Sequence, residues 1–151
     1  AREFFENRDG GSGQYAMNIA ACYNYIGDVC REMKEYQSAL SYYKIAIEKG
    51  TEKVVTNGLG QFYSNVGQMY YFMEKNTEAR TYLEKAIACF EKNGYYWGLE
   101  RAEAYMALVL LRFDEKDQAK KHYKKAVSLT EKMNNPTTVS VIRQISKEAG
   151  F

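Results

Sequence analysis

Hydrophobic positions recur along this chain with the spacing of amphipathic helices. In the segment IGDVCREMKEYQSALSYYKIAI, which starts at Ile26, apolar residues return every three or four positions. The same segment contains Gly27, although a glycine inside a helix costs about 1 kcal/mol relative to alanine. Two further small residues, Ala39 and Ala46, follow within the segment. The placing of these small residues therefore needs a reason other than helix propensity.

The small residues belong to an internal repeat with a period of 40 residues. A shift of 40 positions places Gly27 on Gly67, whereas a shift of about 34 positions places it on Gln61 and loses the pattern. A second shift of 40 positions reaches a third set of small residues. The three sets are Gly27, Ala39 and Ala46; Gly67, Ala79 and Ala86; and Ala107, Ala119 and Ala126. The sequence therefore predicts three copies of one structural unit.

Each copy is predicted to form two antiparallel helices. In the second copy, the apolar spacing predicts helices over 59–73 and 77–92, separated by EKNT. The corresponding breaks are EMKEY in the first copy and FDEKD in the third. Loops this short join neighbouring antiparallel helices. Small residues on the facing sides of such a hairpin let the two backbones approach closely, so a large residue at Ala39 or Ala79 should cost about 1–3 kcal/mol.

The two ends of the chain are interpreted separately from the repeats. Asn135 is a suitable N-cap, Pro136 suits a first helical turn, and Gly150 is placed to end a helix. These signals predict a helix over 136–149 that caps the last hairpin. At the other end, AREFFEN reads as the end of a helix and RDGGSG as a break. The expected single domain, interpreted as part of a larger protein, then divides into 1–13 (remnant helix and linker), repeats at 14–53, 54–93 and 94–133, and the capping helix at 136–149.

Composition favours helix throughout and excludes several classes of protein. Of 151 residues, 46% are hydrophobic and 26% are charged, and there is a single proline. With 21 basic and 19 acidic residues, the net charge of +2 is too balanced to indicate nucleic acid or an anionic membrane as partner. No apolar run reaches the roughly 18 residues of a membrane span. Three cysteines without close pairs, Cys22, Cys30 and Cys89, predict a reducing, cytoplasmic location.

No pattern of residues indicates catalysis, a metal or a cofactor. The only histidine, His122, lacks partners at catalytic or metal-ligand spacing and is expected at the surface. The carboxylates around Asp114 are assigned to a hairpin turn, and GGSG at 10–13 lacks the following Lys-Ser/Thr of a phosphate loop. The aromatic run Tyr95, Tyr96 and Trp97 either packs beneath a link between helices or presents an exposed contact. The chain is therefore not expected to be an enzyme.

The repeated residues resemble the signature of the tetratricopeptide repeat. The matching residues are Tyr23, Ile26, Gly27, Tyr36, Ala39, Tyr43 and Ala46; Tyr63, Val66, Gly67, Tyr70, Ala79, Leu83 and Ala86; and Met106, Ala107, Leu110, Ala119, Tyr123 and Ala126. The resemblance covers about 19–133. Its long period is similar to the repeats of the spindle-orientation adaptor and of bacterial Rap-type regulators. It implies an all-α, right-handed solenoid of three helix hairpins plus a C-terminal capping helix.

Such a solenoid implies a concave groove lined by the first helix of each copy. The positions expected to face this groove are Asn24, Asp28, Arg31, Ser64, Asn65, Gln68, Tyr71, Arg101, Tyr105, Leu108 and Arg112. Asn24 and Asn65 are expected to bond the backbone of an extended peptide, because amides both donate and accept. Arg31, Arg101 and Arg112 are expected to pair with acidic groups.

Two functions follow as hypotheses. The first is a non-catalytic scaffold that binds a protein or peptide of unknown identity in the groove, as the regulatory or sensory part of a larger protein. The alternative is a module that forms homo-oligomers through uncovered ends of the solenoid. Neither hypothesis involves nucleic acid or a membrane.

Overall fold

The computed structural model describes residues 14–51, 58–94, 96–133 and 135–151. In these ranges the chain forms seven α-helices and no strand. The helices are α2 (Gln14–Glu32), α3 (Tyr36–Thr51), α4 (Leu59–Phe72), α5 (Asn76–Asn93), α6 (Leu99–Arg112), α7 (Lys116–Met133) and α8 (Pro136–Ala149). The all-α fold predicted from the sequence is thereby confirmed. The predicted helix and linker at 1–13 lie outside the described residues.

The 40-residue period is visible in the backbone as well as in the sequence. Helices α4 and α6 have 14 residues each, and α5 and α7 have 18 residues each, at positions 40 residues apart. The turns inside the three hairpins place a non-glycine residue in the left-handed region at the same point of each copy. These residues are Lys34, Glu74 and Asp114, with φ of 60°, 60° and 58°. Each hairpin therefore uses the same turn.

The small residues lie where the two helices of a hairpin meet. A Cβ added at Gly27 would lie 2.6 Å from Cε1 of Tyr43, and one added at Gly67 would lie 2.7 Å from Cγ of Leu83. The alanines opposite them, Ala39, Ala79 and Ala119, are all fully buried. The glycines thus admit a large side chain from the second helix, which is the packing role predicted from the sequence.

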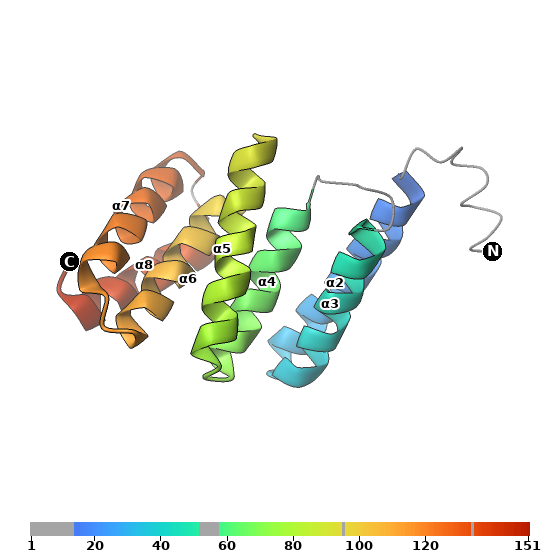
Figure 1. The fold of residues 1–151 in the computed structure, drawn as a ribbon, viewed down its shortest axis with the longest axis horizontal. Helices are drawn as coiled ribbons and strands as arrows, with labels where there is room; N and C mark the ends of the chain where they lie inside the picture. The colour runs from blue at the N-terminus through green and yellow to red at the C-terminus, as the bar shows by residue number, and fades with distance from the viewer. Residues whose placement is uncertain (1–13, 52–57, 95, 134) are drawn as a thin grey trace.

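The hairpins α2–α3, α4–α5 and α6–α7 stack in chain order into a solenoid, with α8 packed against α6 and α7 at the end away from α2 (Figure 1). The helix over 136–149 is present where its signals predict it. Oδ1 of Asn135 accepts a hydrogen bond of 3.0 Å from the backbone N–H of Thr137, and Gly150 ends the helix with φ of 74°. No helix in the described ranges is long and apolar enough to cross a bilayer.

Candidate functional site

A hollow of about 280 Å³, which we call the concave hollow, is lined by the first helices of the repeats, the first hairpin turn, the start of α3 and α8. Its lining residues are Arg31, Glu32, Lys34, Tyr36, Gln68, Phe72, Arg101, Tyr105 and Thr137. Four residues expected to face the groove are among them, one or two from each repeat. The other five were not predicted: Glu32, Lys34, Tyr36, Phe72 and Thr137, the last from the first turn of α8. The concave hollow thus draws on all three repeats and α8.

The concave hollow has an excess of positive charge. Its lining contains three basic residues, Arg31, Lys34 and Arg101, and one acidic residue, Glu32. Arg31 lies 3.6 Å from Asp28, atom Nη2 to atom Oδ1. Arg101 forms no ion pair with any described residue, and its buried Nε has no hydrogen-bond partner there. Burial raises the pKa of Tyr105, while the charges of Arg101 and Arg31 lower it. Both guanidinium groups therefore act on the same phenol in the hollow.

Several of the residues expected to face the groove are bonded within the protein. Nδ2 of Asn65 donates to Oδ1 of Asn24 over 2.8 Å, and Nε2 of Gln68 donates to Oγ of Ser64 over 3.0 Å. Ser64, Asn65 and Gln68 are each only 2% exposed. The two asparagines therefore join α2 to α4 instead of being free for a peptide backbone. Spacing within one hairpin carried no information on the neighbouring helix to which Asn65 bonds.

Asp28 also has a partner inside its own hairpin. The hydroxyl of Tyr43 donates to Oδ1 of Asp28 over 2.6 Å, from α3 to α2. Burial, and then this hydrogen bond, raise the pKa of Tyr43 well above its usual range. The carboxylate of Asp28 thus holds the ring that lies against Gly27.

Tyr71, Leu108 and Arg112 line a different hollow, of about 410 Å³, together with residues of α7 and α8. Nη1 of Arg112 donates to the backbone oxygen of Tyr71 over 2.7 Å and to Oδ1 of Asn76 over 2.9 Å. Its guanidinium carbon lies 3.7 Å from the centroid of the Tyr71 ring. Arg112 therefore ties α6 to the preceding hairpin, in contrast to the expected role of pairing with a ligand.

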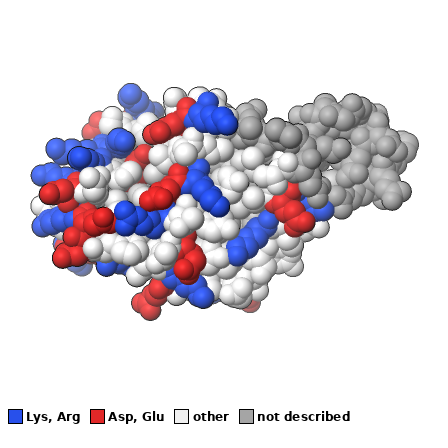
Figure 2. Space-filling view, in the orientation of Figure 1, with Lys and Arg blue, Asp and Glu red and all other residues white. Residues whose placement is uncertain are grey.

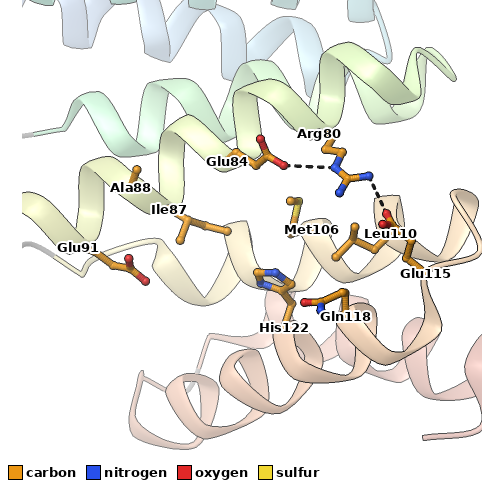
Figure 3. A pocket seen from close by; sticks show the side chains of 10 residues that line it. All are labelled: Arg80, Glu84, Ile87, Ala88, Glu91, Met106, Leu110, Glu115, Gln118 and His122. Carbon is orange, nitrogen blue, oxygen red and sulfur yellow. Dashed lines mark hydrogen bonds and ion pairs between the residues drawn. The ribbon is translucent and has the colours of Figure 1, made fainter.

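A hollow of about 470 Å³ lies among α5, α6 and α7 (Figure 3). In Figure 3, Arg80 of α5 lies between two carboxylates, with Nε 3.2 Å from Glu84 and Nη1 2.6 Å from Glu115. These hydrogen bonds raise the pKa of Arg80 further. Arg80 therefore links two successive hairpins, and its charge is matched on both sides.

His122 lines this hollow but is not the surface histidine that was expected. Its side chain is 20% exposed, and its Nδ1 lies 2.5 Å from Oε2 of Glu103, a carboxylate that is 1% exposed. The signal for this pair was in the repeat: Glu103 of α6 stands at the position of Tyr63 in the second copy. An acid at a core position needs a partner, and the histidine on α7 supplies it.

The link before α6 presents part of its aromatic run to solvent. Tyr96 is 47% exposed and Trp97 is 62% exposed, while Tyr95 lies outside the described residues. Trp97 lines a hollow of about 230 Å³, which we call the link hollow. The other residues of the link hollow are Gln61, Gly98, Glu100, Arg101, Met133 and Asn135. Within it, Glu100 is 3% exposed, and its Oε2 has no partner among the described residues.

Charges of both signs are interspersed on the face shown in Figure 2, which has no extended patch of a single sign. In the described part of the chain, no group of three or more His, Cys, Asp and Glu side chains is placed to hold a metal ion.

Comparison with known proteins finds matches to both the repeat and the fold. The sequence profile described as Tetratricopeptide repeat matches residues 59–132. A type II methyltransferase, M.CeqI of Rhodococcus hoagii, is 33% identical over 107 residues, which are 71% of this chain and 20% of that protein.

Solved structures agree with the fold. The aspartyl phosphate phosphatase F of Bacillus subtilis superposes with a TM-score of 0.74 at 18% identity, over 88% of this chain and 35% of that one. The apo form of RapI superposes with a TM-score of 0.73 at 15% identity, over 92% of this chain and 56% of that one. At such identities the likeness concerns the fold alone. It confirms the predicted similarity to Rap-type regulators at that level, and the chain spans only a minor part of the methyltransferase and of the phosphatase.

Proposed function

Because the chain is a tetratricopeptide-repeat protein over residues 59–132, we propose that it is a non-catalytic scaffold that binds a protein or peptide segment in the concave hollow. Helical repeats of this kind present extended concave surfaces to their partners. We further propose that it is a regulatory or sensory part of a larger protein. Its described cysteines are all free, which suits a reducing compartment such as the cytoplasm.

The observation that carries this proposal is the unpaired state of Arg101. A guanidinium with a buried Nε loses hydrogen bonds to water, and no described residue replaces them at that atom. Arg31 and Lys34 add positive charge to the same hollow, and Tyr36, Phe72 and Tyr105 supply aromatic surface. A partner segment with an acidic side chain beside an apolar one would supply the missing acceptor and cover the rings.

Peptides of matched length and opposite charge test this proposal. Fluorescently labelled peptides that contain Asp and Glu beside Leu or Phe would be titrated against the protein by anisotropy, in parallel with versions that carry Lys instead of each acid. We expect the acidic set to bind more tightly, and Arg101→Gln to weaken its best member by about tenfold or more. Lys125→Gln, which removes an exposed charge from α7, is the matched control. Equal binding of both peptide sets, or equal loss in both variants, would contradict the assignment.

A specific observation also supports the alternative, self-association. One side of α2 and the turn that follows it expose Tyr25, Ile26, Val29 and Met33, at 69%, 40%, 45% and 63%. In the second copy, the positions of Ile26 and Val29 are held by Val66 and Met69, which are fully buried where the preceding hairpin packs against α4. The exposed side of α2 thus has the character of a helix-packing surface, and a second copy of the chain would cover it.

Sedimentation at several protein concentrations distinguishes the two functions. If a second copy covers α2, the protein should be a dimer at high concentration, and Val29→Lys should make it a monomer. Ser38→Lys, on the exposed side of α3, adds the same charge elsewhere and should leave the dimer intact. A wild-type protein that is monomeric at every concentration would refute self-association and leave the groove proposal unaffected.

A further inference from the structure

The link hollow is formed by segments far apart in the sequence and has a buried acid in its wall. Gln61 comes from α4 and Trp97 from the link before α6. Met133 is the last residue of α7, and Asn135 is the N-cap of α8. Glu100, in the first turn of α6, is 97% buried and lines the same hollow. At about 230 Å³, the space suits one side chain of a partner rather than a long segment.

The carboxylate of Glu100 is only partly satisfied by the protein. Nδ2 of Asn135 donates to its Oε1 over 3.3 Å, which is long for such a bond. Its Oε2 accepts no hydrogen bond from any described residue, and no described cation pairs with it. Asn135 cannot turn to offer more, because its Oδ1 already caps α8 through Thr137. A buried carboxylate in this state costs stability unless a donor reaches it.

The surroundings of Glu100 favour a cation over a neutral donor. An indole ring attracts a positive charge over its face, and Trp97 is exposed on the rim. Met133 offers apolar surface for the methylene groups that carry an ammonium in lysine. Arg101 also lines the link hollow, but it lines the concave hollow as well. Its charge therefore stands between the two hollows, where an acid bound in the concave hollow would neutralise it.

We infer that the link hollow is a binding site for a primary ammonium group, which the carboxylate of Glu100 binds and Trp97 covers. Both a lysine side chain and the free N-terminus of a peptide carry this group. The inference concerns a different hollow from the proposed peptide-binding surface, so either can fail without the other. If both hold, a partner would place a basic group against Glu100 and an acidic group against Arg101.

Trp97 is the only tryptophan in the chain, so its fluorescence reports on this hollow alone. The probes are N-acetyl-lysine amide and norleucine amide, which carry a side-chain and an α-ammonium respectively. N-acetyl-norleucine amide has no ammonium, and N-acetyl-glutamine amide offers a neutral donor. We expect saturable changes with a millimolar dissociation constant for one or both ammonium probes, and none for the other two. Binding of N-acetyl-lysine amide would identify the ligand group as a lysine side chain, and binding of norleucine amide would identify it as a peptide N-terminus.

Glu100→Gln should weaken binding of the ammonium probe by about tenfold or more, because the substitution removes the charge and keeps the shape of the side chain. Glu78→Gln removes an exposed acid from the first turn of α5 and should change nothing. Trp97→Leu, followed through the methyl resonance of Met133, should also weaken binding while the fold is retained. The inference is overturned if neither ammonium probe shows saturable binding, or if N-acetyl-norleucine amide or N-acetyl-glutamine amide binds equally well. It is also overturned if the Glu100→Gln protein binds the ammonium probe as the wild type does.

A structural role for Glu100 predicts a different result. If the acid were retained only to stabilise α6, Glu100→Gln would lower the midpoint of thermal unfolding and leave the probes unaffected. For a ligand site with an unpaired buried charge, the same substitution should leave the midpoint unchanged or raise it while probe binding is lost. Measuring both quantities on one preparation separates the two roles.

Discussion

A methyl group added at Gly67 should destabilise the protein, although alanine is the better helix former. The added Cβ would lie 2.7 Å from Cγ of Leu83, 3.0 Å from its Cδ2 and 3.2 Å from its backbone nitrogen. Leu83 is fully buried, so its side chain has little space to move into, and its backbone nitrogen moves only if α5 shifts away from α4. Overpacking costs about 1–3 kcal/mol, while alanine regains about 1 kcal/mol of helix propensity. With a backbone atom among the contacts, we expect a net loss of about 1–2 kcal/mol.

Urea unfolding followed by far-ultraviolet circular dichroism would measure this loss. Ala107→Gly is the matched control, because Ala107 holds the same position in the third copy and is already fully buried. It should also destabilise, by about 1 kcal/mol, through lost helix propensity. A Gly67→Ala protein as stable as the wild type, or more stable, would refute the claim that the glycine sets the distance between α4 and α5.

Three further predictions concern stability. Glu74→Gly should raise the free energy of unfolding by about 0.5–1 kcal/mol, because a φ of 60° strains any residue with a Cβ. Thermal unfolding would show a higher midpoint, and an unchanged midpoint would contradict this prediction. His122→Ala should cost about 2–4 kcal/mol in urea unfolding by leaving the buried Glu103 carboxylate unpaired, whereas His122→Leu with Glu103→Met should recover most of that loss. Because the pKa of Tyr43 is raised in the folded state, the stability it contributes is present below its ordinary value of 10.0 and falls as the pH rises above it. Urea unfolding at increasing alkaline pH should therefore show a decline that Tyr43→Phe makes shallower, and an identical decline in both proteins would exclude this origin.

The repeat architecture could be predicted from the sequence because its signals are local. Whether two helices of a hairpin approach closely depends on the small residues between them, and Gly27 and Gly67 mark that contact in the first two copies. The predicted helices at 59–73 and 77–92 agree with α4 and α5 to within one residue at each end. Capping signals at Asn135 and Gly150 located α8 for the same reason.

The groove was predicted less completely, because its accessibility depends on distances between hairpins. Helical spacing predicts that Ser64 and Asn65 face the groove, away from their own hairpin. It carried no information on how closely the preceding hairpin and α6 pack against α4, and both residues are only 2% exposed. Arg31, Gln68, Arg101 and Tyr105, in contrast, line the concave hollow together.

The clearest departure from the repeat lies in the first turns of α6. Glu100, Arg101 and Glu103 stand where the second copy has Gly60, Gln61 and a tyrosine. Charged side chains at such positions cost several kcal/mol unless they are paired, so a repeat selected for stability alone would not place three of them within four residues. His122 pairs with the carboxylate of Glu103. Among the described residues, no group forms a hydrogen bond with Oε2 of Glu100 or Nε of Arg101. Glu100 and Arg101 line the two hollows proposed as binding sites. The part of the solenoid that deviates most from the repeat pattern is therefore the part that a bound partner would stabilise most, by pairing with these two charges.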